Sequence, residues 1–199
     1  QAEAPDAIHA FTQTKGIAVE LLVNNAGFGA YGEFHRLSLA RQLEMVRVNV
    51  SAVLHLTHLY LPAMIERRSG DILIVASTAA FQGVPYIATY AATKAFDLHF
   101  AEALSEEVRP YGVRVCALCP GSTATEFHAV AGQTVSGSRT KESADKVAQV
   151  GLEALARGKS YVISGAHNYL STHSQRLVPR RLVNRMAGNL FRPKDLSVR

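Results

Sequence analysis

Short, nearly continuous runs of apolar residues recur along the chain and are typical of strands that are buried on both faces. Each run is rich in Val, Ile and Leu and shows little alternation of apolar with polar positions, which favours a parallel sheet. The predicted strands are Val19–Val23, Asp71–Ser77, Val113–Cys119 and Tyr161–Ile163. We therefore expect a parallel sheet that is covered on both faces.

Longer segments with apolar residues three or four positions apart lie between these runs and predict helices. They are Leu39–Arg68, Ala88–Arg109 and Glu142–Arg157. Pro62 is expected to interrupt the first of them, because proline lacks a backbone N–H and its ring clashes with the preceding turn. The alternation of strand and helix indicates right-handed crossovers and an α/β layered fold.

Length and composition favour a single globular domain. The chain has 199 residues, of which 48% are hydrophobic, and this is enough to form a core and argues against disorder. No run of about 18 uncharged apolar residues occurs, so the sequence predicts no membrane-spanning helix. The first residue is Gln1 and no secretory signal pattern follows it, so we expect a cytoplasmic protein.

The net charge of +5 is concentrated near the C-terminus. Residues 176–199 carry seven basic residues and one acidic residue, whereas the rest of the chain carries 14 basic and 15 acidic residues. A nearly neutral body lacks the basic face of a nucleic-acid-binding domain, so no nucleic-acid partner is expected. The sequence thus predicts one domain over residues 1–199 that includes a basic helical tail at 176–199.

The tail contains a segment, Leu177–Phe191, with the pattern of an amphipathic helix. Four apolar residues share one face and two arginines lie off it; they are Val178, Leu182, Met186, Leu190, Arg181 and Arg185. Such a helix either contacts a membrane surface or packs on the body of the protein with its arginines in water. The second interpretation is preferred.

The two cysteines, Cys116 and Cys119, have the CxxC spacing of redox and zinc sites. They fall on a predicted strand, where residues three apart point to opposite faces, so their sulfur atoms are not expected to meet. Zinc would require four ligands, and no second pair occurs. We interpret both as small core residues in a reducing compartment and expect no metal site.

Tyr90 and Lys94 carry the strongest indication of chemistry. Residues four apart on a helix lie on the same face, and an ammonium beside a tyrosine favours the phenolate and lowers the pKa of the phenol. A tyrosine tuned in this way exchanges a proton with an alcohol or carbonyl oxygen. Ser77 ends a predicted strand 13 residues before Tyr90, at the sheet edge where parallel α/β sheets bind ligands.

Further motifs accompany this pair in a fixed order. The set is NNAG at Asn24–Gly27, Asn49 in the first long helix, Ser77, YxxxK at Tyr90–Lys94 and PG at Pro120–Gly121. In order and spacing this set resembles the short-chain dehydrogenase/reductase family, and the resemblance extends over essentially the whole chain. It implies a Rossmann-like, doubly wound parallel sheet that transfers hydride between NAD or NADP and a carbonyl or alcohol substrate.

The resemblance implies a role for each matching residue. Tyr90 would be the general acid or base, Lys94 would hold the nicotinamide ribose and lower the pKa of Tyr90, and Ser77 would orient the substrate oxygen. Asn49 would hold a water that relays protons. The cofactor would contact Asn24, Ala26, Gly27, Tyr90, Lys94, Pro120, Gly121, Thr123 and Thr125. The residues expected at the substrate are Ser77, Phe28, Ala79 and Tyr86.

The resemblance also bears on assembly. It implies a homodimer or homotetramer formed through Leu39–Arg68 and Ala88–Arg109, whose outer faces should then be apolar. Phe28, Phe81, Tyr86 and the loop Ala129–Arg139 indicate an open, apolar pocket that suits lipids, steroids, quinones or aromatic ketones alike. Gly132–Gly137 within that loop has the composition of a mobile segment.

The glycine-rich fingerprint of the family, TGxxxGxG, does not occur in this sequence. Gly27–Gly32 matches GxGxxG, but that motif should open directly into a helix, whereas Glu33–Ser38 has the character of a loop. We therefore expect that the N-terminal βαβ portion, about 60–70 residues, is missing from this chain. The strand Val19–Val23 would then be an exposed apolar edge of the sheet.

Two functions remain open on these grounds. The favoured one is an NAD(P)-dependent oxidoreductase, because Asn49, Ser77, Tyr90 and Lys94 are all present. The alternative is a catalytically incompetent, truncated fold that acts as a binding or membrane-surface protein, and the missing phosphate-binding loop favours it.

Overall fold

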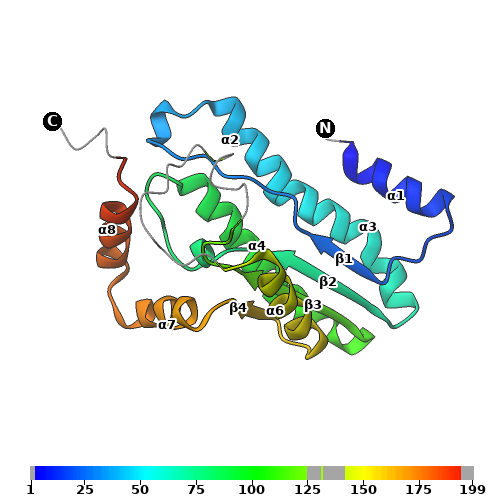
Figure 1. Ribbon diagram of the computed structural model, residues 1–199. Helices are drawn as coiled ribbons and strands as arrows, with labels where there is room; N and C mark the ends of the chain where they lie inside the picture. The colour runs from blue at the N-terminus through cyan, green and yellow to red at the C-terminus, as the bar shows by residue number, and fades with distance from the viewer. Residues whose placement is uncertain (1–2, 125–130, 132–141, 194–199) are drawn as a thin grey trace.

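Four parallel strands form one sheet in the part of the chain that the computed structural model describes, residues 3–124, 131 and 142–193 (Figure 1). They are β1 (Leu21–Asn24), β2 (Gly70–Val75), β3 (Val113–Cys119) and β4 (Tyr161–Ile163), in this order across the sheet. Each neighbouring pair is parallel, which confirms the predicted sheet type. All four strands therefore end at the same edge of the sheet.

Helices cover both faces of this sheet. On one face lie α3 (Ala52–Glu66) and α4 (Ala88–Val108), with α1 (Ala4–Thr14) packed against α3, and on the other lies α6 (Ala144–Ala156) (Figure 1). Successive side chains of β2 point to opposite faces of the sheet, as the two-residue period of a strand requires. Ile72 and Ile74 belong to the core under α3 and α4, and Leu73 belongs to the core under α6.

The two cysteines follow the same alternation on β3. Cys116 packs in the core under α6 and Cys119 in the core under α4, and both thiols are free and buried. The prediction that their side chains face opposite sides of the sheet is confirmed. Burial in apolar surroundings raises the pKa of the Cys116 thiol to about 12 and also raises that of Cys119.

Strand β1 lies at one edge of the described sheet and pairs with β2 alone. Leu22 points into the core under α3, whereas Leu21 and Val23 point to the opposite face, where α6 does not extend over β1, and are 40% and 45% exposed. The expected exposed apolar edge is therefore present among the described residues.

The first long predicted helix is a continuous helical segment, Leu39–Glu66, with an irregular turn inside it. It consists of α2 (Leu39–Val46), a π-helical turn η2 (Arg47–Ser51) and α3. Contrary to expectation, the helix is not interrupted at Pro62, and the irregular turn lies at Asn49 instead. Its 28 residues are long and apolar enough to cross a membrane by length and composition. Here α3 packs on the sheet, so we interpret it as a core helix.

The C-terminal part of the described chain is helical. It comprises α7 (Ala166–Ser174), the 3₁₀ turn η5 (Gln175–Leu177) and α8 (Arg180–Phe191). Ala187 of α8 is buried against Val84 and Ala91, and the Tyr31 hydroxyl donates a hydrogen bond to the Phe191 carbonyl at 2.9 Å. The helix therefore packs on the body of the protein, as preferred.

The face by which α8 packs differs from the predicted one. Three of the four residues of the predicted apolar face point away from the body, with Leu182 47%, Met186 62% and Leu190 60% exposed. The helix contacts the body through Ala187 and Phe191, which pack in one cluster with Val84 and Ala91. The basic helix consequently presents an apolar stripe to its surroundings.

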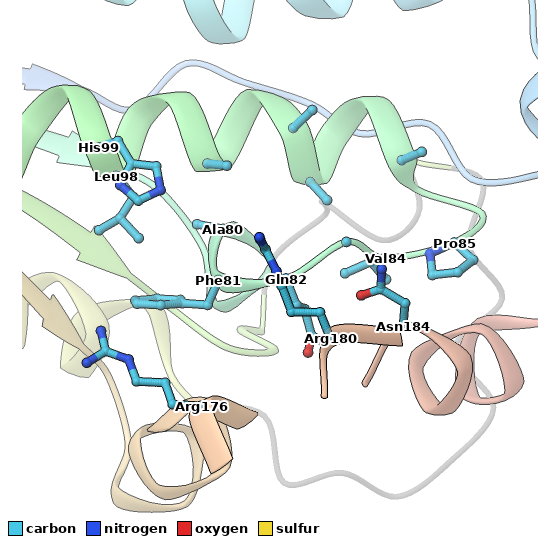
Figure 2. Close-up of a pocket in the computed structure, with 15 residues that line it drawn as sticks. Ala80, Phe81, Gln82, Val84, Pro85, Leu98, His99, Arg176, Arg180 and Asn184 are labelled. Atoms are coloured by element: carbon cyan, nitrogen blue, oxygen red, sulfur yellow. The ribbon is translucent and has the colours of Figure 1, made fainter. Parts of the chain in front are cut away.

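A groove of about 590 Å³ separates α4 from η5 and α8 (Figure 2). Its wall on α4 consists mainly of alanines, and Arg176 and Arg180 lie across from them. Phe81 of the turn η3 (Thr78–Phe81) lines this groove and packs against Tyr161. Phe81 therefore does not join Phe28, contrary to the expectation that both line one pocket.

Candidate active site

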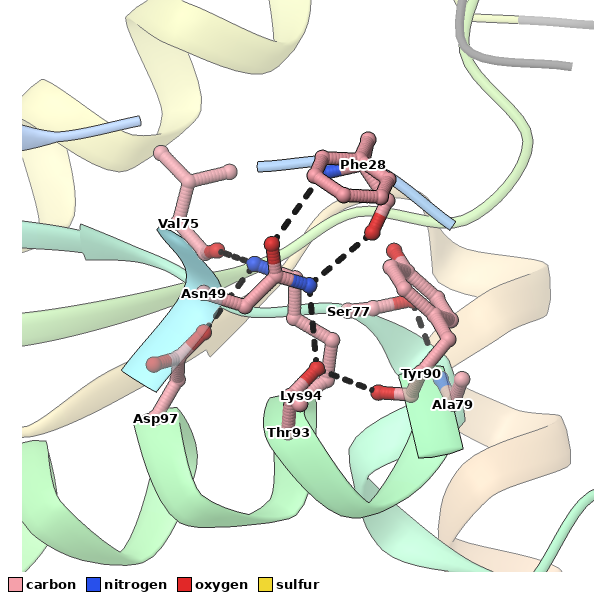
Figure 3. Close-up of polar contacts among 9 residues, drawn as sticks. All are labelled: Phe28, Asn49, Val75, Ser77, Ala79, Tyr90, Thr93, Lys94 and Asp97. Atoms are coloured by element: carbon pink, nitrogen blue, oxygen red, sulfur yellow. Dashed lines mark hydrogen bonds and ion pairs between the residues drawn. The ribbon is translucent and has the colours of Figure 1, made fainter. Parts of the chain in front are cut away.

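One face of α4 carries the residues singled out for chemistry. Tyr90 and Lys94 lie one turn apart and are both buried, and Asp97 follows on the same face (Figure 3). The alanines of the groove in Figure 2 occupy the opposite side of the helix. The groove is therefore separate from this cluster.

Ser77 reaches the cluster from the end of β2. Its backbone is extended and its Oγ accepts a hydrogen bond from the backbone N–H of Ala79 at 3.1 Å, which caps the turn η3. The hydroxyl groups of Ser77 and Tyr90 also interact by a hydrogen bond. The structure thus brings together the serine and the tyrosine that the sequence placed 13 residues apart.

Asn49 is fully buried in the π-helical turn and fixes the loop after β1. Its Oδ1 accepts from the N–H of Phe28 at 3.1 Å, and its Nδ2 donates to the Phe28 carbonyl at 3.0 Å and to Thr93 Oγ1 at 3.0 Å. A π-helical turn often marks a functional position, because it reorients a side chain within a helix. Here it connects the β1 loop to α4.

Lys94 directs its ammonium group toward the end of β2. The Nζ atom donates to the Val75 carbonyl at 2.6 Å and to Asp97 Oδ2 at 3.0 Å. The expectation that Lys94 lowers the pKa of Tyr90 is not met in this structure. Burial raises the pKa of Tyr90 to about 12, the hydrogen bond with Ser77 lowers it, and the Asp97 carboxylate raises it. Lys94 is not among the causes of this shift, and its ammonium is directed to the Val75 carbonyl and to Asp97.

The NNAG segment divides into an internal and an open part. Asn24 is buried and donates from Nδ2 to Thr57 Oγ1 at 3.1 Å, so its side chain supports the fold. Ala26 and Gly27 are exposed at the end of β1. A Cβ on Gly27 would come within 3.1 Å of Asn49 Oδ1 and 3.6 Å of Lys94 Nζ. The glycine therefore leaves the space above the lysine open.

The segment after β3 lies at the same sheet edge. Pro120, Gly121 and Thr123 are partly buried there, while Thr125 and the predicted loops Gly132–Gly137 and Ala129–Arg139, apart from Ala131, lie outside the described residues. The Thr78 N–H donates to the Pro120 carbonyl at 2.9 Å, so this segment lies beside the turn that follows Ser77.

Sequence reasoning missed the residues that hold this segment. The backbone of Glu142 pairs with Ser122 and Ala124, and its Oε2 accepts from Ser164 Oγ at 2.9 Å. Asn168 donates to the Ser164 carbonyl at 2.7 Å and packs so closely on Gly121 that a Cβ there would lie 2.4 Å from Nδ2. No local pattern marks these residues, because they meet only in the fold.

Three of the four expected substrate residues, Ser77, Phe28 and Ala79, lie beside Tyr90. Ala79 and Phe28 pack in one apolar cluster with Tyr90, which also contains Ala30, Met45, Leu37 and Ile87. Tyr86 adopts a left-handed backbone with φ of 67°, and its carbonyl accepts a hydrogen bond from Gly32 at 2.9 Å. The structure thus places an apolar wall beside the phenol.

The segment Gly27–Gly32 does not open into an α-helix. It continues as a loop to the single 3₁₀ turn η1 (Phe34–Arg36), and Gly32 is held by Tyr86. The interpretation that this GxGxxG match is not a dinucleotide fingerprint is confirmed. Among the described residues, no group of three His, Cys, Asp or Glu side chains is placed to bind a metal ion.

With the fold and the site defined, comparison with known proteins places the chain in a family. Residues 1–136 match the short chain dehydrogenase family, and the chain belongs to it. It is 36% identical over 132 residues to the ketoacyl reductase HetN of Nostoc sp., across 66% of this chain and 43% of that protein. It is 35% identical over 113 residues to the human inactive hydroxysteroid dehydrogenase-like protein 1, across 56% of this chain and 34% of that protein.

Solved structures agree with this placement. The short-chain dehydrogenase of Sphingobium yanoikuyae, determined in complex with NADPH, superposes with a TM-score of 0.74 at 25% identity, over 87% of this chain and 69% of that one. The predicted α/β class and the family resemblance are confirmed. The chain spans less than half the length of the two curated relatives named above.

Proposed function

We propose that the chain carries the proton-transfer machinery of an NAD(P)-dependent oxidoreductase acting on a carbonyl/alcohol pair. The observation that supports this most is the convergence of Asn49, Ser77, Tyr90 and Lys94 at one edge of the sheet. These residues come from three elements far apart in sequence, and each side chain is held by a contact that fixes its direction.

The nicotinamide, when bound, supplies or accepts the hydride. The Tyr90 hydroxyl exchanges the proton with the substrate oxygen, and Ser77 orients that oxygen by a second hydrogen bond. Lys94 and the open backbone at Gly27 would hold the ribose. The apolar wall of Phe28, Ala79 and Met45 would exclude water from one side of the reacting atoms and favours an apolar substrate.

Cofactor binding is the direct test. The 199-residue chain is titrated into NADH and into NADPH while nicotinamide fluorescence is followed, and saturable binding to either supports the proposal. Tyr90→Phe should bind as well as the unmodified chain but lose turnover of a panel of apolar ketones, whereas Lys94→Met should lose binding. Absence of binding to both nucleotides contradicts the proposal for this chain.

Assembly is proposed to involve copies of this chain. The outer face of the first of the two helices expected at the interface carries the exposed apolar side chains of Leu39, Leu43 and Leu54. A homodimer or homotetramer through this face would remove them from water. Sedimentation equilibrium decides this, and a monomer at micromolar concentration would contradict it. A cytoplasmic location stays a prediction.

A second candidate function is attachment to an anionic lipid surface through α8. The exposed stripe of Leu182, Met186 and Leu190 lies on a helix that also carries Arg181 and Arg185. A basic helix with an unburied apolar stripe has the character of an interfacial helix, whose cations complement anionic headgroups.

Vesicle sedimentation tests this candidate with a surface variant, because removing the whole helix would disturb its packing. Replacing Leu182, Met186 and Leu190 by serine should abolish pelleting with vesicles that contain anionic lipid. Phe11→Ser, at an exposed apolar position of α1, is the matched control and should pellet normally. If the unmodified chain, the triple serine variant and Phe11→Ser all pellet equally, or if none of them pellets, a lipid-binding role for α8 is contradicted.

A further inference from the structure

Asp97 is a carboxylate buried beside the proton-transfer groups. It is 0% exposed, its Oδ2 accepts from Lys94 Nζ at 3.0 Å, and its Oδ1 has no hydrogen-bond partner among the described residues (Figure 3). A buried carboxylate with an unpaired oxygen costs free energy, and pairing with one ammonium offsets only part of that cost. A contribution to the stability of the fold therefore does not explain why a carboxylate occupies this position.

The position of Asp97 relates it to Lys94 rather than to the rest of the core. The two side chains lie one turn apart on α4 and meet at 3.0 Å, and the lysine is also bonded to the Val75 carbonyl. These two acceptors hold the Nζ atom next to Gly27, at the edge where the strands end. A lysine side chain has four rotatable bonds, so without such acceptors its ammonium would not be fixed there.

We propose that Asp97 is a positioning residue, whose carboxylate holds the Lys94 ammonium at the end of β2 and places a negative charge near Tyr90. The inference rests on the proposed function, because it assigns Asp97 to the same site. Asp97 is not one of the residues that the family resemblance implies, and it acts on the reaction only through its neighbours.

The electrostatics of the cluster involve few ionisable groups. Those of the described residues that face it are Tyr90, Lys94 and Asp97 from α4 and Cys119 from β3, while η2 contributes the neutral amide of Asn49 and β2 a backbone carbonyl. The Asp97 carboxylate raises the pKa of Tyr90. Removing this negative charge should therefore make the phenol easier to ionise.

Tyrosinate absorbance near 295 nm measures this effect without any cofactor. The chain and its Asp97→Asn variant are titrated upward in pH, circular dichroism confirms the fold at each point, and subtracting the signal of a matching Tyr90→Phe protein isolates Tyr90. Asparagine keeps the size of the side chain and one acceptor oxygen. The Tyr90 titration is expected to move to lower pH by about one unit. Glu106→Gln, which removes one carboxylate from an exposed position of the same helix, should leave it unchanged.

A second readout separates position from charge and covers the case in which alkaline unfolding precedes the phenol titration. The rising limb of the pH profile for alcohol oxidation should also move to lower pH in Asp97→Asn. Asp97→Leu, which offers no acceptor, should raise the KM for the nicotinamide at least tenfold, while Asp97→Asn changes it much less.

The outcomes decide the inference separately from the proposed function. A Tyr90 titration and a pH profile that both coincide with those of the unmodified chain, together with an unchanged KM in Asp97→Leu, would mean that Asp97 is only a core residue. If the chain binds neither nucleotide, the proposed function fails. The phenol titration then still shows whether Asp97 controls Tyr90.

Discussion

The Tyr31 hydroxyl donates a hydrogen bond to the carbonyl oxygen of Phe191 at 2.9 Å and so ties the end of α8 to the loop that follows β1. These residues are 160 positions apart, and the same loop carries Phe28 at the apolar wall beside Tyr90. The C-terminal helix is therefore linked to the loop that contributes Phe28 to the apolar cluster around Tyr90, as well as packed on the outside of the fold.

Tyr31→Phe tests this coupling. The change removes one hydrogen bond and leaves the ring in place, so the free energy of unfolding should fall by about 1 kcal/mol. Hydrogen exchange of the amides in α8 should become faster, because the end of that helix loses its anchor. Urea unfolding and hydrogen-exchange mass spectrometry measure the two effects. Tyr111→Phe at an exposed position is the control, and equal exchange of α8 in both variants would contradict the coupling.

Ser77→Ala should reduce turnover far more than it reduces stability. Loss of one donor at the reacting oxygen typically lowers kcat by about 100-fold or more. Loss of the bond to the Ala79 N–H should lower the free energy of unfolding by only about 1 kcal/mol. Steady-state kinetics and urea unfolding provide the comparison, and Ser77→Thr, which keeps a hydroxyl, should recover part of the activity. A kcat within threefold of the unmodified chain would show that Ser77 has no role at the substrate.

Stability should depend on pH through Asp97. Burial raises the pKa of this carboxyl to about 6 in the folded chain, above its value of about 3.9 in an unfolded one. Between these two values the folded state keeps a proton that the unfolded state has lost. The contribution of Asp97 is therefore fully present below about pH 4 and is lost as the pH rises through about 6.

The difference in unfolding free energy between the unmodified chain and Asp97→Asn isolates this contribution. Between pH 4 and pH 8 the unmodified chain should lose about 3 kcal/mol of unfolding free energy relative to Asp97→Asn, which is two pKa units converted to free energy. Urea unfolding at several pH values measures it. Parallel curves for the two proteins would contradict the raised pKa.

The two thiols should be inert while the chain is folded. Cys116 and Cys119 are fully buried, and burial raises the pKa of both, so the reactive thiolate is scarce. A colorimetric thiol reagent should therefore react with neither cysteine in buffer and with both in urea. Rapid reaction of one equivalent in buffer would show that β3 is more accessible than the structure indicates.

Much of the fold was predictable because strands and helices are marked by the spacing of apolar residues within short segments. The strands Val113–Cys119 and Tyr161–Ile163 have the predicted bounds, since buried parallel strands form unbroken apolar runs. The helices α1 and α7 were not predicted, because they have only 11 and 9 residues and each shows few repeats of the helical period. The prediction of which face of α8 packs on the body was wrong because sequence periodicity is local information. The periodicity of Leu182, Met186 and Leu190 marks an apolar face but does not show which surface that face meets.

The site was predictable in its residues but not in its electrostatics. Motif spacing identified Ser77, Tyr90 and Lys94, and the structure brings them together. The pairing of Lys94 with Asp97 depends on burial and on the direction of one side chain, and no spacing reports either. The support of Gly121 by Asn168 is likewise a contact between distant segments.

The π-helical turn at Arg47–Ser51 makes chain length part of the site. Such a turn holds one residue more than a regular α-helical turn, and each residue of an α-helix rotates the next by about 100°. Deleting one residue here would restore a regular helix, but it would move either Asn49 away from Phe28 and Thr93 or the buried face of α3 away from the sheet. Substitutions are therefore far easier to accommodate in this segment than any change in its length, and an alignment that places a gap between Arg47 and Ser51 would have to break one of these two contacts.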